Sequence, residues 1–156
     1  MATEIERKFL VAGDGWRSSV TDHLDIRQAY LSVTDTNTVR VRLSGRAAFL
    51  TIKSAGAGLT RQEFEIAIPF VDAEAMLALR TGRIIEKRRH IAPAGLLRWE
   101  IDVFAGDLDG LVIAEIELPA ETAEFERPHW LGAEVTGDPR YGNSSLATNG
   151  LPSTGR

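Results

Sequence analysis

The stretch Glu-Ile-Glu-Arg-Lys-Phe-Leu-Val at residues 4–11 alternates charged and apolar side chains. Because successive side chains of a strand point to opposite faces, Glu4, Glu6 and Lys8 share one face and Ile5 and Phe9 share the other. Arg7 is the one residue that breaks this alternation. The period of two predicts a β-strand that has one charged face and one apolar face.

Short segments with the same period recur along the whole chain, and turn residues separate them. One of these turns is Gly56-Ala57-Gly58, which we predict to join two strands of a hairpin. The predicted strands are 4–11, 26–33, 38–43, 48–54, 62–68, 83–92, 97–104 and 111–118.

Helices are predicted to be few. The clearest covers 72–81, with Asp72 as its N-cap, Gly82 just past its end, and a stripe of Ala75, Met76 and Leu79 facing the core. Three shorter helical pieces are predicted near 14–24, near 127–131 before Gly132, and in a last turn that Asn143 caps and that carries Leu146.

The charged face of the first strand continues on the other strands. In 83–92 the alternation is ambiguous, since Glu86 and Arg88 compete with Lys87 and Arg89 for the polar face. With Lys87 and Arg89 on that face, it carries eight acids and seven bases. The further members are Arg40, Arg42, Lys53, Arg61, Glu63, Glu65, Glu100, Asp102, Glu115 and Glu117, and 26–33 adds Gln28, Tyr30 and Ser32.

Two interpretations of this face are open: the solvated outer side of a sandwich, or the lining of a closed sheet. Acids and bases sit side by side with little Ser or Thr, and the three lysines all lie on this face while fifteen arginines are spread more widely. In a closed sheet the core would lie outside the strands. It would contain Phe9, Trp99, Ile101, Ile116, Met76 and Leu79. Ion pairs in such a lining add little stability, so a highly charged ligand explains them better.

The bulk composition narrows the classes of function. A chain of 156 residues suits one domain, and a net charge of −4 argues against nucleic acid as the main partner. There is no cysteine, and His23, His90 and His129 are dispersed, so we expect structural roles for the histidines. The N-terminus is not a secretory signal and no apolar run could span a bilayer, so we expect a cytoplasmic protein without a membrane partner.

The ordered motifs resemble the CYTH family, also called triphosphate tunnel metalloenzymes. The resemblance begins at EIERKFL and continues in order along residues 4–148 through QAYL, VRVRL, TIKS, RQEFEIAIP, EKRRH, WEIDVFAGDLDGLVIAEIEL and WLGAEVTGDPRY. It implies an α+β, mostly β fold: an eight-stranded antiparallel closed barrel, or tunnel, with a few helices outside. Residues 1–148 would form this domain, and 149–156 a flexible tail.

The resemblance also implies hydrolysis of a triphosphate with Mg²⁺ or Mn²⁺. Family members act on inorganic triphosphate, thiamine triphosphate, RNA 5′-triphosphate ends or ATP, and a short chain such as this most resembles the bacterial inorganic triphosphatases. Adenylate cyclase activity, giving cyclic AMP and diphosphate, and non-catalytic binding of polyphosphate or nucleotides stay open as alternatives. Monomer and homodimer are equally open.

Residue roles follow from this chemistry. Cationic side chains would bind the phosphates through charge-assisted hydrogen bonds: Arg40, Arg42, Lys53, Arg61, Lys87 and Arg89. Carboxylates would hold the metal: Glu4, Glu6, Asp102, Glu115 and Glu117. Glu63 and Glu65 would orient the cations, and Lys8, with Tyr30 as partner, would orient or deprotonate the attacking water.

Overall fold

The computed structural model describes residues 2–55 and 60–152. The predicted hairpin turn Gly56-Ala57-Gly58 and residues 153–156 of the predicted tail lie outside the described residues. Asn149, which the sequence assigned to the tail, is the last residue of helix α2.

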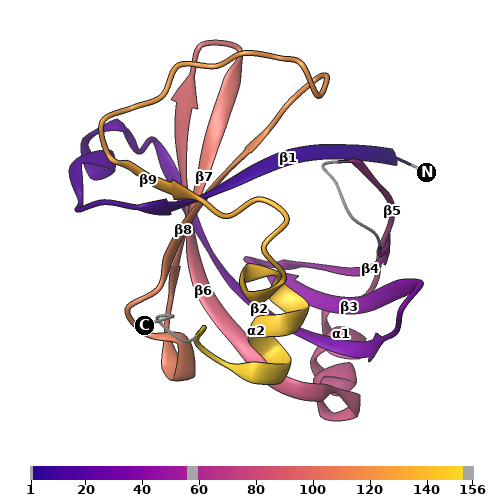
Figure 1. The fold of residues 1–156 in the computed structure, drawn as a ribbon. Helices are drawn as coiled ribbons and strands as arrows, with labels where there is room; N and C mark the ends of the chain where they lie inside the picture. Colours follow the sequence, from indigo (N-terminus) through magenta and orange to yellow (C-terminus); the bar gives the residue numbers. More distant parts are fainter. Residues whose placement is uncertain (1, 56–59, 153–156) are drawn as a thin grey trace.

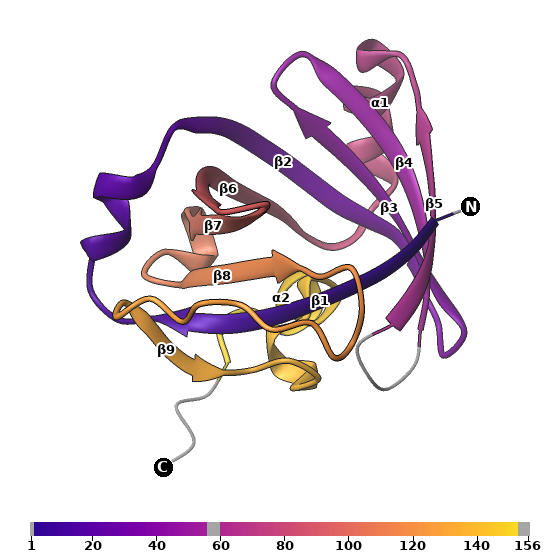
Figure 2. The same cartoon turned by 90° about the horizontal axis from the view of Figure 1, so that it is seen from above.

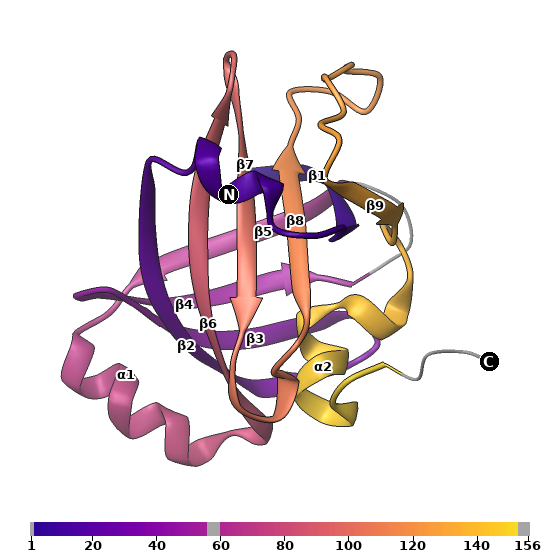
Figure 3. The ribbon, with the colours of Figure 1, turned by 90° about the vertical axis from the view of Figure 1, so that its left-hand side faces the viewer.

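Eight antiparallel strands close into a barrel, as predicted (Figures 1 and 2). The strand order is β5-β4-β3-β2-β6-β7-β8-β1, and pairing of β1 with β5, for example Glu4 opposite Arg61, closes the ring. Strands β2, β6, β7 and β8 lie side by side in Figure 3. The strands are β1 (Ala2–Val11), β2 (Asp22–Val33), β3 (Asn37–Ser44), β4 (Ala47–Ser54), β5 (Thr60–Ala67), β6 (Thr81–Ala94), β7 (Leu97–Phe104) and β8 (Val112–Glu117).

A ninth strand, β9 (Leu131–Glu134), pairs with β1 outside the ring. The helix predicted near 127–131 is therefore wrong, because Leu131 begins this strand instead. A Cβ on Gly132 would lie 3.0 Å from the carbonyl oxygen of Leu10, so the glycine permits close approach to β1 and does not end a helix. Trp130 is buried against the barrel.

The predicted helix 72–81 is present but shifted toward the N-terminus. It consists of α1 (Phe70–Met76) and a 3₁₀ turn, η2 (Leu77–Leu79), and it follows Pro69 and not an Asp72 cap. Its buried positions are Ala73 and Leu77, whereas Leu79 is 72% exposed, so the predicted core position of Leu79 is wrong. Four residues separate Ala73 from Leu77, the spacing that places both on one side of a helix.

The predicted helix 14–24 is reduced to a 3₁₀ helix, η1 (Gly15–Ser19), because β2 already begins at Asp22. Two further 3₁₀ turns are η3 (Gly106–Leu108) and η4 (Pro139–Tyr141). The predicted last turn is helix α2 (Asn143–Asn149), which Gly142 precedes as N-cap. The helices of the described chain are all too short to cross a bilayer.

Most of the hydrophobic core lies outside the barrel wall, as predicted. One cluster contains Phe9, Trp99, Ile101 and Ile116 under η1 and the segment before β9, and a second packs Ala73 and Leu77 of the α1–η2 helix against β2, β3 and β4. A third cluster was not predicted. It lies on the inner face at one end of the barrel and joins Leu146 of α2 to Tyr30, Ile85, Phe104 and Ile113.

Candidate active site in the barrel interior

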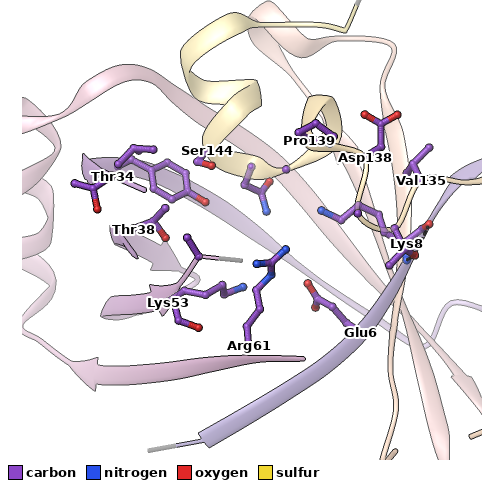
Figure 4. Close-up of a pocket in the computed structure, with 18 residues that line it drawn as sticks. Glu6, Lys8, Thr34, Thr38, Lys53, Arg61, Val135, Asp138, Pro139 and Ser144 are labelled. Atoms are coloured by element: carbon purple, nitrogen blue, oxygen red, sulfur yellow. Dashed lines mark hydrogen bonds between the residues drawn. The ribbon is translucent and has the colours of Figure 1, made fainter. Parts of the chain in front are cut away.

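A cavity of about 390 Å³ opens into the charged interior (Figure 4). Five residues predicted from the sequence line it: Glu6, Lys8, Tyr30, Lys53 and Arg61. A further wall, next to Lys8, is formed by residues 135–144, which follow β9 and include the first residues of α2. Lys53, Arg61 and Glu6 extend toward the middle of the cavity in Figure 4.

Lys53 is held between two carboxylates from neighbouring strands. Its Nζ lies 2.9 Å from Oε1 of Glu4 and 3.9 Å from Oε2 of Glu63. Burial lowers the pKa of Lys53, but the charges of Glu6 and Glu4 outweigh it and raise the pKa overall. Burial and a hydrogen bond with Glu4 raise the pKa of Glu63 to about 7. Glu4 and Glu63 therefore share one cation and a proton near neutral pH.

The carboxylates at this end crowd one another. Burial, with the charge of Glu115, raises the pKa of Glu6 to about 8, and burial with the charge of Glu4 raises the pKa of Glu117. Burial also acts to raise the pKa of Glu4. Hydrogen bonds with Glu63 and Lys53, together with the charge of Lys53, lower it by more than burial raises it, so the pKa of Glu4 is lowered overall. Too little positive charge surrounds these carboxyl groups for all of them to ionise at neutral pH. A divalent cation bound among them would supply the missing positive charge and favour their ionised forms.

Within residues 2–55 and 60–152, no three His, Asp or Glu side chains form a group that could hold a metal ion by themselves. Mg²⁺ typically uses one or two carboxylates, several waters and phosphate oxygens of the substrate. The crowded oxygen donors therefore fit a hydrated Mg²⁺ or Mn²⁺ that is completed by a phosphate ligand.

Asp102 lies in a buried network with Lys87 and Arg89. Its Oδ2 is 2.7 Å from Nζ of Lys87, and its two oxygens accept hydrogen bonds of 2.8 and 2.9 Å from Arg89. Burial alone would raise the pKa of Asp102, but the charges of Lys87 and Arg89 hold it well below its usual range. Burial lowers the pKa of Lys87 to about 7. Burial also acts to lower the pKa of Arg89, but the charge and hydrogen bonds of Asp102 outweigh it, and the pKa of Arg89 is raised. These three residues, predicted to bind metal and phosphate, bind one another; like Glu4, Glu115 and Glu117, they are not among the residues that line the cavity.

Two arginines of β3 occupy the interior beside this network. Arg42 donates from Nε to Oε1 of Gln28 at 2.6 Å, and burial, with the charge of Arg40, lowers the pKa of Arg42 to about 9. Arg40 donates from Nη2 to the hydroxyl of Thr51 at 3.3 Å. Among the described residues, Nε of Arg40 and Nε2 of Gln28 are buried donors without a hydrogen-bond acceptor. Buried donors normally have acceptors, so these two are available to an anionic ligand.

Lys8 projects into the cavity from β1. Its Nζ donates to the carbonyl of Tyr141 at 3.2 Å and lies 4.0 Å from Oε2 of Glu115. Tyr30 lines the same cavity and is 5% exposed, but the described contacts of Lys8 lead to Tyr141 and Glu115. Glu65 is exposed on β5, opposite Thr51, and does not reach the cavity lining.

The wall at residues 135–144 is the part of the site that strand periodicity did not reveal. Lys8 contacts the carbonyl of Tyr141, and Lys87 donates to Oδ1 of Asn143 at 3.5 Å. The available signal was the sequence block WLGAEVTGDPRY, which contains Thr136-Gly137-Asp138-Pro139 and whose Gly137 has a φ of +77° and permits the turn.

These features define a class of protein: an antiparallel eight-stranded tunnel whose interior carries carboxylates and cations around one cavity. The sequence profile of the CYTH domain family matches residues 2–148, and the chain belongs to this family.

Similar proteins span nearly the same length. The chain is 44% identical to an inorganic triphosphatase of Acetivibrio thermocellus, with 96% of each chain covered. It is 45% identical to an inorganic triphosphatase of Nitrosomonas europaea, over 93% of this chain and 97% of the other. A crystal structure of the inorganic triphosphatase NE1496 matches with a TM-score of 0.68 and 38% identity, covering 98% of this chain and 99% of that chain.

A putative adenylyl cyclase from Hippeastrum, described as having a dominant triphosphatase activity, matches with a TM-score of 0.59, covering 75% of this chain and 80% of that chain. At 12% identity this likeness shows a common fold and does not show a common activity.

Proposed function

We propose that this protein hydrolyses inorganic triphosphate to diphosphate and phosphate inside the barrel, with Mg²⁺ or Mn²⁺ as its metal. The observation that carries the proposal is the cavity itself, where Lys8, Lys53 and Arg61 face the same space as Glu6. The 44–45% identity to two inorganic triphosphatases, over at least 93% of the chain, makes inorganic triphosphate the leading substrate.

The cations bind and orient the substrate. A triphosphate carries several negative charges, and charge-assisted hydrogen bonds from Lys53 and Arg61 would hold it in the cavity. The buried donors of Arg40 and Gln28, and the neighbouring Arg42, would donate hydrogen bonds to further phosphate oxygens deeper in the barrel. Such preorganised donors stabilise the charge that builds up on the transferred phosphoryl group.

Glu4, Glu6, Glu115 and Glu117 would hold the metal. When bound, the metal supplies positive charge to the phosphoryl oxygens and to the departing diphosphate. Lys8 would orient the water that attacks the terminal phosphorus, with the hydroxyl of Tyr30 in the same cavity. The new bond joins the water oxygen to that phosphorus, and the bond broken is the bridging P–O bond, whose electrons leave with diphosphate. One proton of the water stays on the phosphate that forms, and the other is released to solvent.

The contacts of Asp102 support a role different from the metal binding that the sequence suggested. Because both of its oxygens are occupied by Arg89 and Lys87, we propose that it holds the interior wall together and does not bind the metal.

A substrate panel tests this function. The purified protein would be incubated with inorganic triphosphate, ATP or thiamine triphosphate, each with Mg²⁺, Mn²⁺ or EDTA, and free phosphate, diphosphate and cyclic AMP would be measured. We expect metal-dependent release of phosphate, fastest from inorganic triphosphate. Cyclic AMP with diphosphate from ATP would instead identify a cyclase, and tight binding without turnover under every metal would identify a binding protein.

A further inference from the structure

Strand β1 changes neighbours at Lys8. Its pairing with β5 runs from Ala2 to Ile5, and its pairing with β9 begins at Phe9 with a shift of register before Val11. In the described register, residues 6–8 have a strand neighbour only on the β8 side. Lys8 therefore lies where the barrel wall has a gap in its ladder of hydrogen bonds.

Residues after β9 fill this gap. The backbone N–H of Lys8 donates to the hydroxyl oxygen of Thr136 at 2.8 Å, and the backbone N–H of Val135 donates to the carbonyl of Lys8 at 2.8 Å. A side-chain hydroxyl thus replaces the missing strand partner. Without it, a half-buried N–H in the wall would lose its acceptor.

The hydroxyl of Thr136 is itself held from outside the barrel. It has one proton and two acceptors in range: Oε2 of Glu134 at 2.7 Å and the carbonyl of Lys8 at 3.3 Å. The shorter bond directs the proton to Glu134, so a lone pair faces the N–H of Lys8. Arg7 fixes Glu134 with hydrogen bonds of 2.8 and 2.6 Å, which gives a role to the residue that broke the strand alternation.

The same segment holds the side chain of Lys8. Its Nζ donates to the carbonyl of Tyr141, five residues beyond Thr136. The turn between them is closed by a hydrogen bond from the N–H of Asp138 to the carbonyl of Val135, at 3.0 Å. The backbone and the ammonium of Lys8 are therefore fixed relative to each other by one short stretch of chain.

We propose that Thr136, held by the outer Arg7–Glu134 pair, is a positioning residue that sets the place of Lys8 in the cavity. The inference rests on the proposed function of Lys8 but concerns residues outside the cation and carboxylate set. Removing the hydroxyl lets β1 move at Lys8 and misplaces the ammonium relative to the attacking water. Displacements of about 1 Å at a reacting centre cost on the order of 10²-fold in rate.

The test compares Thr136→Val, which keeps the shape and removes the hydroxyl, with Thr136→Ser, which keeps the hydroxyl. We expect Thr136→Val to lower kcat for inorganic triphosphate on the order of 10²-fold with KM changed little. Thr136→Ser should restore most of kcat. Glu134→Gln should also lower kcat, because its amide can donate to the hydroxyl and turn the hydroxyl proton toward Lys8.

A matched control is Arg88→Ala. Arg88 forms an outward ion pair with Asp25 at 2.8 Å, like the Arg7–Glu134 pair, but on β6 and β2. We expect wild-type kcat in this variant. Amide hydrogen exchange adds a readout independent of turnover: the N–H of Lys8 should exchange faster in Thr136→Val than in Thr136→Ser.

The outcomes separate the two proposals. Wild-type kcat and unchanged exchange at Lys8 in a folded Thr136→Val protein would overturn the positioning role. A wild-type protein that does not hydrolyse triphosphate would overturn the proposed function, while the exchange rates would still decide whether Thr136 holds Lys8. If Thr136→Val does not fold, Glu134→Gln decides, and wild-type kcat in that variant would reject the positioning role.

Discussion

Asp102→Asn should destabilise the barrel strongly, because the substitution keeps the shape of the side chain and removes a buried charge. Asp102 is 2% exposed, and the Lys87 side chain beside it is 0% exposed. Breaking a buried ion pair from one side typically costs about 3–5 kcal/mol, since the other charge is left without a partner.

The contacts that remain set the expected size of the loss. Arg89 keeps Glu100 at 3.5 Å and Glu115 at 3.7 Å, whereas Lys87 keeps only a hydrogen bond of 3.5 Å to Asn143 among its described polar contacts. Only the ammonium of Lys87 is stranded, and it can lose its proton because burial already lowers its pKa to about 7, so the loss should lie near the low end, about 3 kcal/mol. For a chain of this size that corresponds to a fall in Tm of about 6–12 °C.

Urea unfolding followed by circular dichroism measures the loss, and two further variants control it. Asp25→Asn breaks the exposed ion pair between Asp25 and Arg88, whose 2.8 Å distance equals that between Asp102 and Arg89. Because this pair is exposed, the urea midpoint should hardly move. Lys87→Met combined with Asp102→Asn removes the stranded ammonium and should recover part of the stability. A loss in Asp102→Asn no larger than in Asp25→Asn would refute the view that this network holds the wall.

Three further predictions concern the cavity and its apolar end. Lys8→Ala and Glu4→Ala should each slow hydrolysis on the order of 10²–10³-fold while circular dichroism stays that of the folded protein, and near-normal turnover would remove them from the mechanism. Because burial and Glu115 raise the pKa of Glu6 from 4.5 to about 8, this carboxyl keeps its proton in the folded state and loses it in the unfolded state over that range. Stability without metal should therefore fall as pH rises from about 4.5 to 8, and Glu6→Gln should flatten this slope in urea titrations with EDTA. Leu146→Ala should cost about 2–5 kcal/mol in thermal unfolding, since this fully buried side chain joins α2 to the inner cluster, and an unchanged Tm would contradict that packing.

The eight barrel strands could be predicted because alternation is a local property of the sequence. Strand β9 could not, since Leu131–Glu134 is only four residues long and its pairing depends on a distant segment, β1. The helix boundary at Phe70 was missed because an Asp at position 72 is a good N-cap in isolation, whereas packing of Ala73 and Leu77 against the barrel decided where the helix lies.

Alternation predicted which face of the strands carries the candidate site residues, but not which of them meet or how far along the barrel each one lies. Alternation places Asp102 on the inner face beside Glu100, yet it cannot show which cation each carboxylate meets. It also cannot show that the same inner face becomes apolar at Ile85 and Phe104 toward one end. Those distinctions depend on the stagger of strands around the barrel, which the three-dimensional pairing sets.

The position of β9 and α2 in the chain has a consequence for synthesis. All eight strands of the ring leave the ribosome before residues 131–149, at about 5–20 residues per second in a growing chain. Until that last segment arrives, the apolar side chains that meet Leu146 are uncovered and the amide of Lys8 lacks its hydroxyl acceptor. The ring of strands can thus close before this segment emerges, but the interior cavity is complete only once residues 131–149 have left the ribosome and packed.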